Sequence, residues 1–136
     1  MKKKILIIQG SSLKKINIKT DTSFFLGLEA QRRRYQIYYY EPKDLSFING
    51  KVTAFCSKVK FLDNPKQPVK IISKSVLNLL QAKLILIRSE PPFNQQYINT
   101  TFILEHISKK VRIINHPKAL REVPEKLFSL RLIRYM

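Results

Sequence analysis

The sequence predicts an α/β domain in which a mainly parallel sheet carries one inserted β-hairpin. Short, wholly apolar segments alternate with longer segments of helical periodicity, as in a chain that passes repeatedly between strands and helices. The pair Asn49-Gly50 interrupts this alternation between two segments of strand character. The 136 residues suffice for one domain of ordinary size, and a hydrophobic content of 44% can supply its core.

The first 40 residues predict a strand, a helix and a second strand. Residues 4–8 are almost wholly apolar, which is typical of a strand buried on both faces. Asp21 or Thr22 can cap a helix that runs from Ser23 to about Arg34. Residues 35–40 are aromatic and β-branched and therefore favour a strand. The three elements together indicate a βαβ unit with parallel strands.

The rest of the chain predicts the inserted hairpin and a second βαβ unit. We expect residues 44–48 and 51–58 to pair across Asn49-Gly50, because this dipeptide suits a two-residue hairpin turn. Further elements are expected in this order: a short helix over 76–80, a strand over 84–87, a helix over 95–109, a strand over 111–114, and helical pieces over 118–121 and 125–130. The pattern as a whole is that of a Rossmann-like α/β domain.

Two predictions concern individual side chains on the expected helices. Glu29 should face Arg32 and Arg33, which follow it by one helical turn. On the second long helix one stripe should be buried, and it consists of Tyr97, Thr100, Ile103, Leu104 and Ile107.

The charge is strongly basic, with 26 Lys and Arg against 9 Asp and Glu and a net charge of +17. Such a charge raises the possibility of a nucleic-acid-binding module. The basic residues are spread along the whole chain, however, and no nucleic-acid-binding motif is present. We therefore expect nucleic acid not to be the partner.

The cysteine and histidine content argues against metal and disulfide chemistry. A single cysteine, Cys56, cannot form an intramolecular disulfide, and we expect it to be a small buried residue. His106 and His116 lie too far from other ligands to suggest zinc. No apolar segment reaches the about 18 residues that span a bilayer. These features predict a cytoplasmic protein without a membrane partner.

Candidate binding residues lie in the loops that follow the parallel strands, because ligands of such sheets bind there. These loops are residues 9–20, 88–94 and 115–117. Arg88 could hold a substrate carboxylate through two parallel hydrogen bonds, or it could pair with an acid for structural reasons alone. The three glycines do not form either of the common glycine-rich phosphate-binding loops. No catalytic residue and no metal ligand is predicted.

Several segments in the same order resemble the N-terminal domain of bacterial glutathione synthetase. They are residues 16–19, 21–24, 28–33, 44–45, 48–50, 88–94, 97–98, 101–105, 115–117, 120–121 and 125–128. The most specific is Arg88-Ser89-Glu90-Pro91-Pro92-Phe93-Asn94, which is similar to the family's Arg-Lys-Asp-Pro-Pro-Phe-Asp. The chain departs from the family at Gln9-Gly10-Ser11, where the family has Asp-Pro, and at Glu90 and Asn94, where aspartates are usual.

The resemblance implies a pre-ATP-grasp domain over residues 1–128, followed by an unrelated tail over 129–136. The family joins γ-glutamylcysteine to glycine with ATP and magnesium. By resemblance, Asp21, Ser23 and Arg88 are substrate-binding residues on the dipeptide side, and Lys126 contacts ATP.

The resemblance stops before the ATP-grasp region, and this leads to several expectations. The chain is expected to be a truncated, catalytically incomplete product that is inactive as a ligase and binds no cofactor by itself. An alternative is a subunit that pairs with a separate ATP-grasp chain, and a homo-oligomer is a further possibility. Apolar surface near residues 115–136 is expected to promote self-association.

Overall fold

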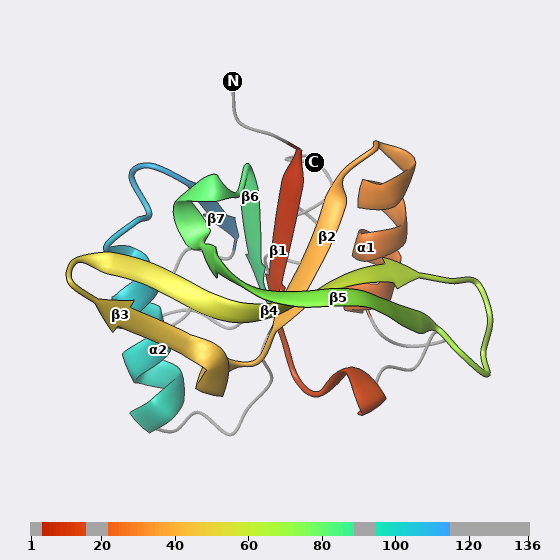
Figure 1. The fold of residues 1–136 in the computed structure, drawn as a ribbon, viewed down its shortest axis with the longest axis horizontal. Helices are drawn as coiled ribbons and strands as arrows, with labels where there is room; N and C mark the ends of the chain where they lie inside the picture. The colour runs from red at the N-terminus through yellow and green to blue at the C-terminus, as the bar shows by residue number, and fades with distance from the viewer. Residues whose placement is uncertain (1–3, 16–21, 89–94, 115–136) are drawn as a thin grey trace.

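The computed structural model describes residues 4–15, 22–88 and 95–114 (Figure 1). In chain order the elements are β1 (Ile5–Gln9), the short 3₁₀ helix η1 (Leu13–Lys15), α1 (Thr22–Arg32), β2 (Gln36–Tyr40), η2 (Pro42–Asp44), β3 (Leu45–Ile48), β4 (Lys51–Phe61), β5 (Val69–Asn78), η3 (Leu79–Gln81), β6 (Leu84–Ile87), α2 (Gln95–Glu105) and β7 (Arg112–Ile114). The helical pieces predicted over 118–121 and 125–130, and the apolar surface expected near 115–136, lie outside the described residues.

Four strands of the sheet are parallel and lie side by side in the order β2-β1-β6-β7, with β7 last in the described strand order. All five residues of β1 are buried, because helices cover both faces. Ile5 and Ile7 pack with Leu104 of α2 on one face, whereas Leu6 and Ile8 pack with Phe24, Leu26 and Ala30 of α1 on the other. The predicted α/β class with parallel strands and an inserted hairpin is confirmed.

The inserted hairpin extends the sheet with antiparallel strands. β3 pairs with β4 across Asn49 and Gly50, whose φ angles of 53° and 75° suit a two-residue turn of the predicted kind. One edge of β4 pairs first with β3 and then, through Ser57–Val59, with β2. The other edge pairs with β5 along almost its whole length. Figure 1 shows this ribbon turned strongly away from the direction of β1.

The prediction of a short helix over residues 76–80 is wrong. Residues Val76–Asn78 complete β5, and only Leu79–Gln81 form a turn of 3₁₀ helix. The strand forms because residues distant in sequence pair with it, as Phe55 of β4 pairs with Val76. Most of β5 is exposed, so its sequence lacks the apolar alternation that marks a half-buried strand.

Helix α1 ends at Arg32, two residues before the predicted end, in a Schellman motif. The backbone N–H of Tyr35 donates to the carbonyl of Ala30, and that of Arg34 donates to the carbonyl of Gln31. Arg34 takes the left-handed position with a φ of 68°. The predicted pairing is confirmed, because the carboxylate of Glu29 lies 3.3 Å from both Arg32 and Arg33.

Helix α2 is shorter than predicted, because it ends at Glu105 instead of residue 109. Successive hydrogen bonds three residues apart continue the chain as turns, from His106 to Ile103 and from Ser108 to Glu105. The predicted stripe is confirmed where it is described, since Thr100, Leu104 and Ile107 are buried. No helix in the described part of the chain is long and apolar enough to cross a membrane.

Candidate binding edge and an adjacent pocket

The carboxyl ends of β1, β2 and β6 are joined by backbone hydrogen bonds into one edge. The N–H of Arg88 donates to the carbonyl of Gln9 at 2.7 Å, and the N–H of Gly10 donates to that of Tyr40 at 3.1 Å. These bonds fix where the chain leaves each strand. Two of the predicted loops, 9–20 and 88–94, therefore start side by side at the edge where ligands of parallel sheets bind.

Gln9 and Tyr40, the last residues of β1 and β2, are buried beneath this edge. Gln9 is only 1% exposed, and its Oε1 accepts a hydrogen bond from the Tyr40 hydroxyl at 2.7 Å. Burial, with a smaller contribution from Cys56, raises the pKa of Tyr40 well above its ordinary value of 10.0. The phenol therefore stays protonated and donates. A neutral amide at residue 9 suits this donor.

Arg88 follows β6 directly and is half-buried, with its Nε atom fully enclosed. Burial restricts the guanidinium to few orientations, as a side chain that holds a planar carboxylate requires. Its neighbour Glu90 lies outside the described residues, so the alternative of a purely structural ion pair with that acid is not tested. The substrate-binding role of Arg88 stays a prediction.

The other predicted site residues are only partly described. Ser23 lies in the first turn of α1 with 6% of its surface exposed, beside the core rather than on an open surface. Asp21 and Lys126, like His116, lie outside the described residues. The structure therefore brings Arg88 and the beginning of α1 to the same end of the sheet, and the roles of Asp21, Ser23 and Lys126 stay predictions.

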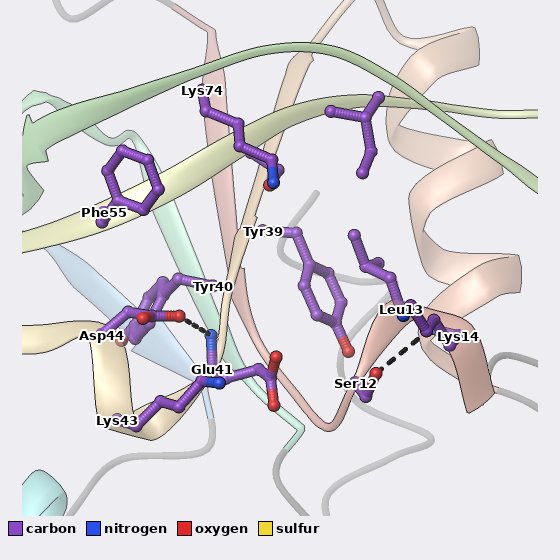
Figure 2. Close-up of a pocket in the computed structure, with 12 residues that line it drawn as sticks. Ser12, Leu13, Lys14, Tyr39, Tyr40, Glu41, Lys43, Asp44, Phe55 and Lys74 are labelled. Atoms are coloured by element: carbon purple, nitrogen blue, oxygen red, sulfur yellow. Dashed lines mark hydrogen bonds between the residues drawn. The ribbon is translucent and has the colours of Figure 1, made fainter.

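A pocket of about 300 Å³ opens beside this edge, on the face of the sheet that α1 covers (Figure 2). Four segments contribute its walls: the loop after β1 with η1, the end of β2 with η2, the middle of β4, and β5. The lining residues are Ser12, Leu13, Lys14, Tyr39, Tyr40, Glu41, Lys43, Asp44, Phe55, Ser57, Ile71 and Lys74. Ser12, Leu13 and Lys14 lie in the predicted binding loop 9–20, whereas the other lining residues were not predicted, because they join the site only when β4 and β5 fold over the end of β2.

The loop after β1 is held against the pocket by Tyr39. The Tyr39 hydroxyl donates to the carbonyl of Ser11 at 2.6 Å. A Cβ atom on Gly10 would overlap this hydroxyl, so the glycine permits the close approach of loop and ring. Gly10 is the one signal in the sequence that could have pointed to this contact.

The two acids of the pocket are engaged in local structure. Asp44 Oδ2 accepts from the Glu41 N–H at 3.4 Å, and the pair forms a capping box around η2. Within the described residues, Lys14, Lys43 and Lys74 form no ion pair with an acid. The charge that remains unmatched in the pocket is therefore positive.

Cys56 lies behind the pocket wall and is fully buried, as predicted. Burial, with the Asp44 carboxylate adding to it, raises the pKa of the thiol to about 12. A thiol of this kind is not a nucleophile at neutral pH. The described residues also contain no group of three or more His, Cys, Asp or Glu side chains that could hold a metal ion.

Comparison with known proteins decides the family. Residues 4–121 match the model for the N-terminal domain of prokaryotic glutathione synthetase. The chain belongs to this family. The resemblance inferred from the motifs is thereby confirmed, together with the connection to glutathione synthetase that it implied.

Relatives of the glutathione synthetase family resemble the chain over most of its length. A glutathione synthetase of Buchnera aphidicola from Schizaphis graminum is 42% identical over 118 residues, which are 86% of this chain and 37% of the relative. One from Mesorhizobium japonicum is 39% identical over 94% of this chain and 41% of the relative. One from Escherichia coli K12 is 40% identical over 84% and 36%. The chain thus spans about two fifths of the length of these relatives. The boundary predicted at residue 128 stays a prediction.

Proposed function

We propose that this chain supplies the N-terminal, dipeptide-binding side of a glutathione synthetase, which joins γ-glutamylcysteine to glycine at the expense of ATP. The observation that carries this proposal is the family match over residues 4–121, with relatives named glutathione synthetase about 40% identical over most of the chain. The fold supports it, because the parallel strands present their carboxyl ends as one binding edge.

Arg88 is the residue that we expect to bind the dipeptide. It leaves β6 at the binding edge, where its backbone is fixed to Gln9. The planar guanidinium can donate two parallel hydrogen bonds to one carboxylate of γ-glutamylcysteine. Asp21 and Ser23 are proposed to complete this subsite from the beginning of α1, and Lys126 is proposed to contact ATP.

The 136-residue chain is proposed to be inactive as a ligase by itself. In the family the reaction uses ATP and magnesium, and the described residues offer no cluster of acids that fits a metal ion. About three fifths of the relatives' length has no counterpart here. Phosphoryl transfer depends on groups that position the nucleotide and neutralise its charge, so these groups must come from elsewhere.

Binding of γ-glutamylcysteine by the chain tests the proposed dipeptide side directly. Calorimetry with the full chain should detect binding, and Arg88→Lys should weaken it about tenfold, because the lysine keeps the charge and loses the paired hydrogen bonds. Arg112→Lys, at an exposed position on β7, is the matched control and should bind as the wild type does. Equal weakening by both variants, or the absence of binding, would contradict the role of Arg88.

An activity assay tests whether the chain is catalytically incomplete by itself. The purified chain with γ-glutamylcysteine, glycine and Mg-ATP should form no glutathione. A polypeptide with the remaining part of a related synthetase should be added in a second reaction. Glutathione formed only in the mixture would support a subunit that pairs with a separate ATP-grasp chain, whereas turnover by the chain alone would refute the proposed incompleteness.

A further inference from the structure

We propose that the pocket between η1, η2 and the β4–β5 ribbon binds a small molecule that carries one anionic group on an apolar body. The pocket uses neither Ser23 nor Arg88, so this proposal does not depend on the role given to Arg88. A volume of about 300 Å³ lies at the lower end of the usual range for small-molecule sites and therefore limits the ligand to a small compound.

The positive charge in the pocket determines the sign of the ligand. Lys14, Lys43 and Lys74 come from three different elements and converge on one space, as Figure 2 shows most clearly for Lys74, which reaches from β5 toward the centre. The carboxylates of Glu41 and Asp44 lie on the same wall and keep their charges, so three ammonium groups face two carboxylates and the pocket has an excess of one positive charge. Ammonium groups without acidic partners attract an anion and can donate hydrogen bonds to it.

The apolar side chains that line the pocket determine which apolar group the ligand carries. Phe55 is 49% exposed and Ile71 is 48% exposed, although both lie on the same face of the ribbon as the buried Val59 and Phe61. In Figure 2 the rings of Phe55 and Tyr39 stand on opposite sides of the space that Lys74 enters. A flat apolar group between these rings would cover the exposed part of Phe55. The hydroxyl of Ser57 adds a polar group beside Lys74.

Phenyl phosphate is a suitable probe, because it combines a single phosphate with one aromatic ring. The full chain, labelled with ¹⁵N, is titrated with phenyl phosphate at low ionic strength. We expect the amide signals of residues 12–14, 39–41, 43–44 and 74 to shift together along one saturation curve. Inorganic phosphate should bind several-fold more weakly because it lacks the ring, and benzyl alcohol should not bind because it lacks the charge.

Matched lysine variants separate the pocket from the general positive charge of the chain. Lys74→Gln should weaken the binding of phenyl phosphate about three- to fivefold, as expected for the loss of one exposed charge contact. Lys70→Gln is the control, since it removes the same charge from the same strand at a residue that does not line the pocket. Both side chains are exposed, so neither change should disturb the fold.

A third variant tests the apolar wall. Phe55→Ser should weaken the binding of phenyl phosphate and leave the binding of inorganic phosphate unchanged. The proposal is overturned if Lys70→Gln and Lys74→Gln weaken binding equally, if phosphate binds as tightly as phenyl phosphate, or if the shifted amides lie outside the pocket. A further result would overturn it: γ-glutamylcysteine displaces phenyl phosphate, while Arg88→Lys still weakens the binding of γ-glutamylcysteine. The pocket would then belong to the substrate site.

Discussion

Among single residues, Gly27 shows most clearly how packing can depend on the absence of a side chain. Gly27 of α1 lies against the ring of Phe61, and a Cβ atom at residue 27 would overlap that ring. The same ring packs edge-on against Phe24 with centroids 5.7 Å apart. The side-chain amide of Gln31, one helical turn further, makes two hydrogen bonds with the backbone of Phe61: Nε2 donates to the carbonyl at 3.0 Å, and Oε1 accepts from the N–H at 2.5 Å. Gly27 and Gln31 therefore set the distance between α1 and β4.

Gly27→Ala should destabilise the protein by about 1–3 kcal/mol, because the new methyl group forces the Phe61 ring to move within a packed core. Alanine is normally the better helix former by about 1 kcal/mol, so the sign of the effect reports on the contact. Urea denaturation measures it. The exposed position Phe25→Ala in the same helix is a control that should change stability less, and a stabilised Gly27→Ala variant would contradict the close packing.

Cys56 and Tyr40 predict a loss of stability at alkaline pH. The thiol has its pKa raised from 9.0 to about 12 by burial and by Asp44, and burial also raises the pKa of Tyr40. Above pH 9 the unfolded chain releases a proton that the folded chain keeps. The stabilisation is therefore complete below pH 9 and is lost as the pH rises toward 12, by about 1.4 kcal/mol per pH unit for each such proton.

Denaturation of wild type and Cys56→Ala between pH 6 and 11 measures this contribution. The variant should lose part of the alkaline slope, whereas its difference in unfolding free energy from the wild type should stay constant below pH 8. Identical slopes above pH 9 would contradict a raised pKa of the thiol. The buried thiol should also react slowly with a disulfide reagent until the chain unfolds.

At the scale of elements, helix ends and the ribbon show where local sequence stops being informative. The Asn49-Gly50 turn was predictable because both residues tolerate a positive φ and are common in such turns. The end of α1 was placed two residues late, because Arg34 occupies a left-handed position that usually holds glycine. The strand β5 was missed because its stability comes from pairing with β4, which the local pattern does not record.

Arg34→Gly should stabilise the protein by about 0.5–1 kcal/mol. The replacement relieves the cost of a left-handed conformation in a residue with a side chain, and the Schellman hydrogen bonds remain. Arg32→Gly is the matched control: it removes the same side chain type from the last helical residue, and it should destabilise by about 1 kcal/mol. Thermal unfolding of the two variants should therefore move in opposite directions, and a common direction would contradict the assignment of the helix end.

At the level of the whole molecule, the basic residues are spread along the sequence and are not gathered in one segment. The charge of +17 comes from residues along the entire chain, and Glu29 forms ion pairs with two of them, Arg32 and Arg33. Such a surface attracts any polyanion at low salt through many weak contacts. The sequence contains none of the recognised nucleic-acid-binding motifs.

Double-stranded DNA should therefore bind only weakly and without sequence preference. Complexes seen in a mobility-shift assay at 50 mM salt should disappear by about 200 mM, since each phosphate contact adds to the salt dependence. Two unrelated DNA sequences of equal length provide the control. A complex that survives 200 mM salt and distinguishes the two sequences would instead favour a nucleic-acid-binding module.

The α/β class, the parallel strands and the hairpin turn were all predictable from local sequence patterns. These features follow from local patterns: wholly apolar segments such as Ile5–Ile8 become doubly buried strands, and Asn49-Gly50 suits only a tight turn. It also placed Arg88 at a strand end and supplied the motifs that identify the family.

Which side chains share the pocket became apparent only from the folded structure. Ser12, Glu41, Phe55 and Lys74 are far apart in sequence, and they meet because β4 pairs with β2 on one edge and with β5 on the other. The same pairing turned the residues after Leu62 into a hairpin that no local periodicity indicates. Side-chain patterns record which face of an element is buried, whereas strand pairing depends on backbone hydrogen bonds that every sequence can form.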